Sequence, residues 1–370
     1  MLLFIYQLSA GGAEKKAVEI ANNLSGRYDV TVRTIIDCSS ERTQLHPSVK
    51  YEFCFDKQFR VDKWLFKLGY FLSPKLLHRL LIPGDYDVEI AGMEGVPSKV
   101  VSGCRKSKTQ LIAIIHASCK NIAWPRGRYL NKKQEVDSYS GFDNLVFVST
   151  DTRRDFFQVF PEVHRNAVVL HNPFDFAQIR ESAQAGVCEL EIQPNRFIFC
   201  AVGRLESVKG FDRLIQAMKS IVFAFPNTDL IIVGGGPLEE ELKALVKDLG
   251  LSEHVFLVGP RHNPYPYISQ ANCYVCSSVS EGLSTTVIEA LALARPVVAT
   301  DCGGMEDALG GGRIGLVVEN SENGLLEGLF SMREGLLNEV SVAELERHLR
   351  KFEKDSYFDR FQALIEGEDS

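Results

Sequence analysis

The stretch FIFCAVGRLESVKGFDRLIQAMKSIVFAFPNTDLIIVGG (197–235) decides the fold. It holds two short apolar runs, 197–203 and 230–235, on either side of an amphipathic run at 211–225. Short runs that stay apolar throughout are typical of strands covered on both faces in a parallel sheet. The stretch therefore predicts a strand, a helix and a second strand, which is the repeating unit of a doubly wound α/β fold.

The same alternation continues over most of the 370 residues, a length that suggests about two domains. A second helical pattern covers 237–250, and further apolar runs predict strands at 2–8, 30–36, 51–55, 87–92, 111–116, 145–150, 167–172, 255–259, 273–278, 296–300 and 315–319. The series pauses after 172, where the chain has proline at both ends and mixed polarity. We predict a Rossmann-like N-terminal domain at 1–172, a hinge at 173–196, a Rossmann-like C-terminal domain at 197–345 and a helical tail at 346–370.

Composition is that of an ordinary globular protein, with 45% apolar and 24% charged residues. No stretch approaches the roughly 18 apolar residues of a membrane span. The opening MLLFIYQLS lacks the basic flank and cleavage site of a signal peptide and is expected to be a buried strand. The net charge of -7 conceals an asymmetry, because residues 1–175 carry +5 and 176–370 carry -12. We expect the basic half to face an anionic partner.

Two familiar patterns are not expected to carry chemistry. The nine cysteines are odd in number and mostly lie in apolar segments, which indicates reduced thiols. Cys273 and Cys276 have C-x-x-C spacing, but on a strand residues three apart point to opposite faces. GGGRIG (310–315) matches the dinucleotide fingerprint yet leads into a strand and opens no helix, so it is expected to be a turn, which disfavours a nicotinamide oxidoreductase.

Arg204 and Lys209 follow the strand at 197–203, in a short loop before a helix that begins near Phe211. Ligands bind beyond the carboxyl ends of the strands in an open parallel sheet. Two cations beside a helix N-terminus would there hold a phosphate or diphosphate. Two solvated surface charges beside a tight turn explain the spacing equally well.

The segment SEGLSTTVIEALALARPVVATDCGG (280–304) adds two carboxylates, Glu281 and Glu289, around a helix expected to start near Ser284 or Thr285. Gly282 keeps the loop close to a ligand, and the two hydroxyl residues can cap the helix. The amides at that N-terminus favour an anion. Glu281 could accept hydrogen bonds from sugar hydroxyls, and Glu289 suits the diol of a ribose. A capping residue and an ordinary helix glutamate remain the alternative.

These motifs together resemble glycosyltransferase family 4. The resemblance rests on the Glu-x7-Glu pair of SEGLSTTVIEAL, on GRLESVKGFDRLI, on HNPYPYISQANCYVCSS (262–278) and on GGAEKKAVEIANNL (11–24). It implies a retaining enzyme of the GT-B fold, with two Rossmann-like domains that face each other across a cleft and a C-terminal helix that crosses back. The N-terminal domain would bind the acceptor, and the C-terminal domain would bind a nucleotide-sugar donor, a UDP-sugar being expected.

The resemblance also implies roles for the residues above. Arg204 and Lys209 would hold the donor diphosphate and neutralise the leaving nucleotide, so that neither a metal nor another cofactor is expected. Glu289 would hold the ribose, and Gly12 would let the first loop approach the diphosphate. The transferred sugar would be bound by Glu281 and by the backbone amides of Gly282, Leu283, Ser284 and Thr285.

His116 ends the strand at 111–116. A lone histidine after an apolar run is more often structural, but the resemblance implies a position beside the sugar and the acceptor. It also implies front-face transfer, in which a phosphate oxygen of the leaving group takes the proton of the acceptor hydroxyl. No side-chain nucleophile is then required.

The basic first half bears on the acceptor. Residues 57–79 contain six Lys or Arg and one acid, among aromatics and leucines, and residues 95–134, with Trp124, Arg126 and Arg128, contain no acid. An amphipathic helix on anionic lipid and a core helix with extended lysines explain the first segment equally well. Family members often act on polyprenyl-diphosphate-linked sugars or glycolipids, whereas nucleic acid is disfavoured by the acidic chain and the lack of a reading motif.

We therefore expect a cytoplasmic hexosyltransferase of cell-surface polysaccharide or glycoconjugate synthesis, peripheral on the inner face of the membrane if the basic half binds lipid. It would act on a glycan or a polyprenyl-diphosphate-linked acceptor. The alternatives are a UDP-sugar epimerase of the same fold and a non-catalytic protein that binds sugar nucleotides.

Overall fold

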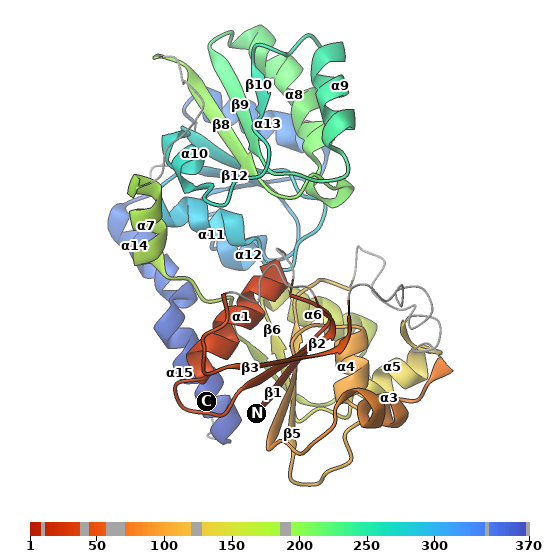
Figure 1. The fold of residues 1–370 in the computed structure, drawn as a ribbon. Coiled ribbons are helices and arrows are strands. Elements are labelled where there is room, and N and C mark those ends of the chain that lie inside the picture. The colour runs from red at the N-terminus through yellow and green to blue at the C-terminus, as the bar shows by residue number, and fades with distance from the viewer. Residues whose placement is uncertain are drawn as a thin grey trace. The chain divides into compact units, whose positions relative to one another are not determined.

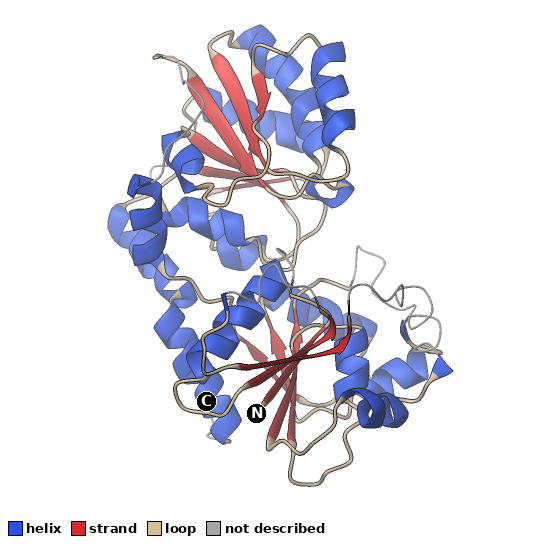
Figure 2. Ribbon diagram, viewed as in Figure 1, coloured by secondary structure: helices blue, strands red, loops and turns tan. Residues whose placement is uncertain are grey.

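The chain forms two compact units in a computed structural model that describes residues 1–8, 12–37, 44–56, 71–119, 128–185, 194–336 and 340–367. Unit 1 comprises Met1–Pro173 together with Asp355–Ser370, and unit 2 comprises Phe174–Lys354. Each unit has a central sheet with helices around it (Figures 1 and 2). Among the described helices, none has the length and apolar character needed to span a bilayer.

Unit 1 is built on a seven-stranded parallel sheet in the order β3-β2-β1-β4-β5-β6-β7. Leu2 and Phe4 belong to the apolar cluster on one face of the sheet, whereas Leu3 and Ile5 belong to the cluster on the other. The continuous apolar run at 2–8 is thus explained by burial on both sides. The strands are β1 Leu2–Ile5, β2 Thr31–Ile36, β3 Lys50–Phe55, β4 Val88–Ala91, β5 Gln110–Ile115, β6 Asn144–Phe147 and β7 Asn166–Val169. The described helices are α1 Gly12–Leu24, α3 Pro74–Leu81, α4 Val96–Val101, α5 Lys132–Tyr139, α6 Thr150–Val159 and α15 Lys354–Glu366.

Unit 2 is built on a six-stranded parallel sheet in the order β10-β9-β8-β11-β12-β13. Every predicted strand, in both units, overlaps an observed one, which confirms two doubly wound parallel sheets. The strands are β8 Phe197–Val202, β9 Thr228–Val233, β10 Val255–Leu257, β11 Cys273–Cys276, β12 Val297–Thr300 and β13 Leu316–Val318. The described helices are α7 Phe176–Ala185, α8 Phe211–Ala224, α9 Glu239–Asp248, α10 Tyr265–Gln270, α11 Thr285–Ala292, α12 Met305–Ala308, α13 Glu322–Arg333 and α14 Val342–Leu349.

The strand order reverses once in each sheet, and this reversal locates the candidate site. In unit 2 the chain proceeds from β8 outward to β9 and β10, then returns to the other side of β8 with β11, β12 and β13. The loops that follow β8 and β11 therefore diverge from adjacent strand ends. In open α/β sheets, ligands bind in the crevice at such a switch point, outside the carboxyl ends of the strands.

The unit boundaries differ from those expected. The predicted hinge at 173–196 contains α7, which packs with α10 and α11 in unit 2 because Phe176 and Ile179 are buried there. Residues 186–193 lie outside the described part. The predicted tail at 346–370 is also divided: α14 and a 3-10 turn at Arg350–Phe352 belong to unit 2, and α15 belongs to unit 1.

The tail divides at a backbone pairing. The Phe174 amide donates to the Phe352 carbonyl at 2.9 Å, and the Lys354 amide donates to the Phe174 carbonyl at 3.1 Å. Beyond this point the apolar face of α15 is buried in the core of unit 1, through Tyr357, Phe358, Phe361 and Leu364. The amphipathic pattern predicted the helices but not which unit each would join.

Candidate active site

Lys209 and Glu281 form an ion pair at the switch point of unit 2. Lys209 closes the 3-10 turn Ser207–Lys209 after β8, and Glu281 lies in the loop between β11 and α11. Their Nζ and Oε1 atoms are 2.6 Å apart. The Ser278 hydroxyl donates to the same carboxylate oxygen, also at 2.6 Å. Two residues that are distant in the sequence thus converge where the fold places ligands.

Ser277 joins the loops after β8 and β11 through its hydroxyl and its carbonyl oxygen. The Ser277 hydroxyl donates to the Lys209 carbonyl at 2.8 Å, and the Arg213 guanidinium donates to the Ser277 carbonyl at 2.9 Å through Nε. Gly210 has a φ of +60°, and a Cβ there would lie 2.4 Å from the Ser277 oxygen. Only glycine allows this approach, so the position of Lys209 is set by the end of β11 as well as by β8.

The charge of Lys209 is maintained by its partner. Burial disfavours the ammonium, but the charge and the hydrogen bond of Glu281 outweigh that effect and raise the pKa of Lys209. The lysine stem crosses closely over Gly203 at the end of β8, where an added Cβ would lie 3.5 Å from its Cδ. A charged ammonium is therefore held at the carboxyl edge of the sheet.

The helix start at Thr285 is as predicted, but its cap is not. Ser284 occupies the N-cap position without making a side-chain cap hydrogen bond. Its hydroxyl lies 3.3 Å from that of Thr286, which also accepts a 2.6 Å hydrogen bond from Tyr274. Because these hydroxyls bond one another, no side-chain cap closes the first turn of α11, and its amides are available to an anion.

The loop that carries Glu281 is supported from below by Gly304. Gly304 has a φ of +79°, and a Cβ there would lie 2.4 Å from the Gly282 oxygen and 2.8 Å from the Leu283 Cα. The Leu283 side chain is buried, which also holds the loop in place. The backbone of Gly304 therefore contacts the backbone of the Glu281 loop directly, with no side chain between them.

Arg204 and Glu289 are placed at the edge of this arrangement. The Arg204 side chain is 66% exposed and forms an ion pair with Glu206 at 2.7 Å. Glu289 is half-buried on α11 and accepts a hydrogen bond from the Tyr265 hydroxyl at 3.5 Å. Of the four predicted charged residues, the structure thus brings Lys209 and Glu281 into direct contact, with the other two held by different partners.

Comparison with known proteins identifies the family of this chain. The family model described as glycosyl transferases group 1 matches residues 188–330, which include the whole Lys209–Glu281 region. A Campylobacter jejuni enzyme, N-acetylgalactosamine-N,N'-diacetylbacillosaminyl-diphospho-undecaprenol 4-alpha-N-acetylgalactosaminyltransferase, is 30% identical over 345 residues, 90% of this chain and 89% of that one. The chain belongs to the group 1 glycosyltransferases.

Other relatives match this glycosyltransferase over part or all of its length. An uncharacterised glycosyltransferase of Methanocaldococcus jannaschii is 32% identical over 201 residues, so the match spans about half of each chain, 51% and 50%. An Anabaena protein whose crystal structure holds UDP has the same fold, with a TM-score of 0.76, 18% identity and 99% coverage of both chains. The GT-B architecture predicted from the sequence is thereby confirmed.

Unit 1 of the glycosyltransferase contains the remaining predicted residues. His116 directly follows β5; its Nε2 donates to the Gly92 carbonyl at 3.2 Å, and burial lowers its pKa to about 4. The ring is therefore neutral at pH 7, with Nδ1 as a hydrogen-bond acceptor. Gly12 begins α1, and an added Cβ would meet no atom within 4 Å among the described residues, apart from its chain neighbours and its own helix. Residues 9–11 of the glycine loop lie outside the described part.

Sequence reasoning missed Glu94. Its carboxylate accepts a 3.0 Å hydrogen bond from the backbone amide of His116, and burial raises its pKa. It lies in the loop after β4, next to the reversal of strand order at β1 in unit 1. The available signal was its place in the sequence. Glu94 follows β4 by three residues, and β4 is the neighbour of the strand that His116 follows.

The thiol pair Cys276 and Cys302 was also missed. Both are buried beside Lys209, at the ends of the neighbouring strands β11 and β12, and the Cys302 thiol hydrogen-bonds to Cys276 and lowers its pKa. Cys273 instead bonds to the Tyr274 carbonyl. The C-x-x-C pair is thus split between two faces of β11, as predicted.

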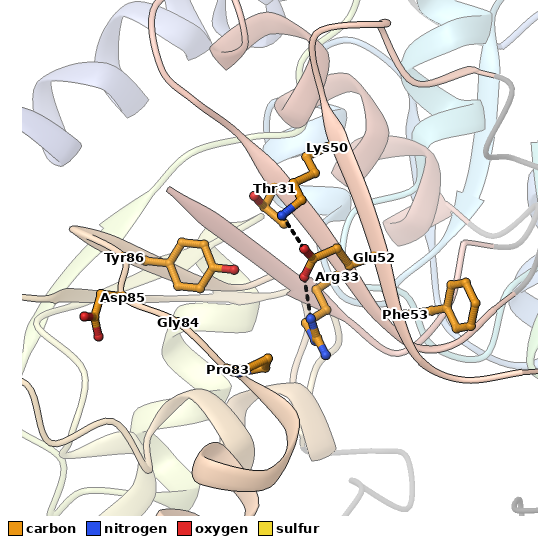
Figure 3. Close-up of a pocket in the computed structure, with 9 residues that line it drawn as sticks. All are labelled: Thr31, Arg33, Lys50, Glu52, Phe53, Pro83, Gly84, Asp85 and Tyr86. Carbon is orange, nitrogen blue, oxygen red and sulfur yellow. Dashed lines mark hydrogen bonds and ion pairs between the residues drawn. The ribbon is translucent and has the colours of Figure 1, made fainter.

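A cavity of about 520 Å³ in unit 1 is not a candidate for the transfer reaction (Figure 3). It is lined by Thr31 and Lys50, the first residues of β2 and β3, and by Arg33 and Tyr86. Glu52 separates the two cations by pairing with both, at 2.6 Å for Lys50. Because this cavity opens at the amino ends of the strands, it lies at the opposite edge from a switch-point site.

Proposed function

We propose that this glycosyltransferase is a retaining enzyme that moves a hexosyl unit from a UDP-sugar to a glycan or lipid-linked saccharide. The product would belong to a cell-surface polysaccharide or glycoconjugate. The observation that carries the proposal is the Lys209–Glu281 ion pair, 2.6 Å long, beside the uncapped first turn of α11. A cation, a carboxylate and the backbone amides of a helix start, all at the carboxyl edge of one sheet, suit a diphosphate joined to a sugar.

The positive groups would act on the leaving nucleotide. Lys209 would exchange part of its contact with Glu281 for a diphosphate oxygen, and the exposed Arg204 would swing from Glu206 to a second oxygen. Preorganised positive charge that meets charge developing in the transition state is the effect that a divalent ion supplies elsewhere. Catalysis is therefore proposed to be independent of a metal.

The negative groups would act on the sugars. Once Lys209 turns to the diphosphate, the Glu281 carboxylate can accept hydrogen bonds from hydroxyls of the transferred sugar. The amides of Gly282, Leu283, Ser284 and Thr285 would bind the donor from the same loop. Glu289, which accepts a hydrogen bond from Tyr265 on α10, would bind the ribose diol.

Retention would follow from transfer on one face of the donor. The bond between the anomeric carbon and the diphosphate oxygen breaks, the acceptor oxygen bonds to that carbon from the same side, and the acceptor proton passes to the departing diphosphate. No side-chain base is needed in this scheme. His116 and Gly12 are proposed to contribute contacts from unit 1, with the neutral His116 ring accepting a hydrogen bond from a sugar or acceptor hydroxyl.

The relatives support the substrate class. The name of the Campylobacter enzyme specifies a diphospho-undecaprenol-linked saccharide as its acceptor. Two solved structures of the same Anabaena protein hold UDP and UDP-glucose. We therefore propose a UDP-sugar as donor and a polyprenyl-diphosphate-linked saccharide as acceptor.

Ligand-induced stabilisation tests the donor. UDP should raise the thermal midpoint of the purified chain in a concentration-dependent manner, with about 2.7 kcal/mol of stabilisation at a hundredfold excess over Kd. GDP and NAD serve as matched nucleotides and should stabilise the protein less. UDP-sugars are then screened for transfer to a polyprenyl-diphosphate-linked acceptor, with and without chelator, and nuclear magnetic resonance defines the anomeric configuration of the product.

Each outcome has a distinct meaning. Equal stabilisation by NAD would refute the donor assignment, and loss of turnover in chelator would refute metal independence. Conversion of the donor sugar without an acceptor would indicate an epimerase, and UDP binding without any turnover would indicate a binding protein.

In the same assay His116→Asn should lower transfer while UDP stabilisation stays as in the parent protein.

We further propose that α3 contacts anionic lipid. This helix exposes Leu76 and Leu80, by 41% and 61%, and each of them follows an exposed cation, Lys75 or Arg79. Apolar side chains flanked by cations suit the interface of an anionic bilayer. Residues 57–70, the rest of the predicted basic helix, and residues 120–127, which include Trp124 and Arg126, lie outside the described part of the chain.

Liposome co-sedimentation tests this surface. The chain should sediment with phosphatidylglycerol vesicles and less with neutral ones, and binding should decline as salt rises past about 0.1 M. The double variant Leu76→Ser/Leu80→Ser should reduce binding. Phe223→Ser is the matched control, since Phe223 is 91% exposed but lies on α8 of unit 2. Equal binding by parent and double variant would contradict the proposal.

A further inference from the structure

Three side chains of different chemistry meet inside unit 1. They are His78 in α3, Glu89 in β4 and Cys104 after α4. The imidazole, carboxylate and thiol can each present one ligand atom such that all three atoms lie within 4.8 Å of one another. All three residues are buried, with exposures of 7%, 0% and 8%.

The strand neighbours of Glu89 are apolar. Glu89 is paired in register with Leu2 on one side and Leu111 on the other, and both are buried in the same core. One carboxylate oxygen lies 2.8 Å from the His78 Nε2. The other oxygen, Oε1, is buried without a hydrogen-bond partner among the described residues. A buried carboxylate oxygen without a partner is costly, so a cation bound at this point would be stabilising.

The fold holds the thiol against α3. Gly103 precedes Cys104, and a Cβ at Gly103 would lie 2.0 Å from the Pro74 oxygen and 2.8 Å from the Lys75 nitrogen. The loop after α4 is thus in backbone contact with the first turn of α3, and the two helices pack together. Two of the ligands therefore lie on α3 and β4, and the loop that carries Cys104 is held against α3 by this backbone contact.

The donor set selects the kind of ion. One nitrogen, one oxygen and one sulfur at this spacing suit Zn²⁺, which binds imidazole, carboxylate and thiolate at about 2.0–2.3 Å in tetrahedral geometry. Ca²⁺ and Mg²⁺ require more oxygen ligands. A carboxylate, a thiolate and a neutral imidazole carry two negative charges, which would neutralise one divalent cation in this apolar setting. The nearby Lys106 is directed to Asp85 and the Gly84 carbonyl at the surface.

We propose that His78, Glu89 and Cys104 bind a zinc ion in unit 1, with a water as the fourth ligand. The ion would take the place of the direct contact between His78 and Glu89, would displace the thiol proton of Cys104 to solvent, and would join α3, β4 and the α4–β5 loop. It would stabilise unit 1 and take no part in the transfer step. The proposal does not depend on the donor site, which lies in unit 2.

Metal analysis of the full chain tests the site. Chelator-treated protein is incubated with Zn²⁺, freed of excess metal by gel filtration and analysed by mass spectrometry, with one zinc per chain expected. Co²⁺ is added as a spectroscopic substitute, and a thiolate-to-cobalt charge-transfer band is expected. Cys104→Ser should abolish the band and lower zinc affinity by at least about tenfold, the loss seen when even an outer partner is removed.

Variants of two other cysteines test whether the cobalt charge-transfer band comes from Cys104. Cys54→Ser removes a half-buried thiol on the same face of the sheet, and Cys276→Ser removes the paired thiol of unit 2, so both should keep the band. Circular dichroism and the urea midpoint of each variant serve as the check that it retains the fold. If Cys104→Ser does not fold, Glu89→Gln and the protection of Cys104 from alkylation by Zn²⁺ in the parent chain give the answer. A missing band, a band lost in Cys276→Ser, or unprotected Cys104 would overturn the proposal and leave a plain His–Glu pair.

Discussion

Lys209→Ala should lower kcat/KM for the donor by about 10²–10³-fold, the loss observed when one preorganised group that stabilises developing charge is removed. Two effects contribute. The variant deletes the cation expected to meet the leaving diphosphate, and it leaves the Glu281 carboxylate, 13% exposed, without its partner. Steady-state kinetics with the UDP-sugar identified in the screen, together with calorimetric titration of UDP, measure both effects.

Three further variants test whether the loss in Lys209→Ala comes from its charge at the donor site. Lys219→Ala removes an exposed lysine of α8 and should leave both measurements unchanged. Glu281→Gln keeps the shape of the carboxylate without its charge and should impair transfer more than UDP binding. Lys209→Arg retains the charge and should recover part of the UDP affinity. Unchanged UDP affinity in Lys209→Ala would show that the diphosphate binds elsewhere.

Gly304→Ala should destabilise unit 2 by about 3 kcal/mol and weaken donor binding. An alanine at a φ of +79° is strained, which costs about 1–3 kcal/mol by itself. Its Cβ would also collide with the Gly282 oxygen and the Leu283 Cα, so the loop that carries Glu281 must shift. Urea denaturation measures the free energy of unfolding, and calorimetry measures UDP affinity.

Gly250→Ala is the matched control for backbone strain. Gly250 has a nearly identical φ of +71°, but a Cβ there meets no atom within 4 Å. It should therefore show the strain cost alone and keep normal UDP affinity. Equal destabilisation by the two alanines, with equal UDP affinity, would mean that the contact between Gly304 and the Glu281 loop has no energetic weight.

Local patterns predicted the elements because each reports a local property. Apolar runs such as 197–203 are continuous because both faces of a parallel strand are covered, and the period of 211–225 reflects one buried face of α8. The boundaries were less certain. The segment after 172 was expected to be a hinge although 176–185 forms α7, because its few apolar residues, Phe176 and Ile179, give only a weak periodic signal.

The candidate site was predicted in part. Lys209 and Glu281 were both chosen, since each follows a strand and precedes a helix. The local context did not indicate that Ser284 would bond Thr286 instead of capping α11, or that Arg204 would pair with Glu206. Those details depend on side chains that arrive from other elements, such as Tyr274 on β11.

The sequence by itself determined the strands, the helices, the doubly wound class and the residue types available for chemistry, because propensity and burial period act over a few neighbours. Only the tertiary structure decided which of those residues meet. Lys209 contacts Glu281 because β8 and β11 are adjacent at the reversal of strand order, and Cys104 approaches His78 and Glu89 because Gly103 lets one loop touch α3. Contacts of this kind arise from the packing of whole elements, which no local pattern encodes.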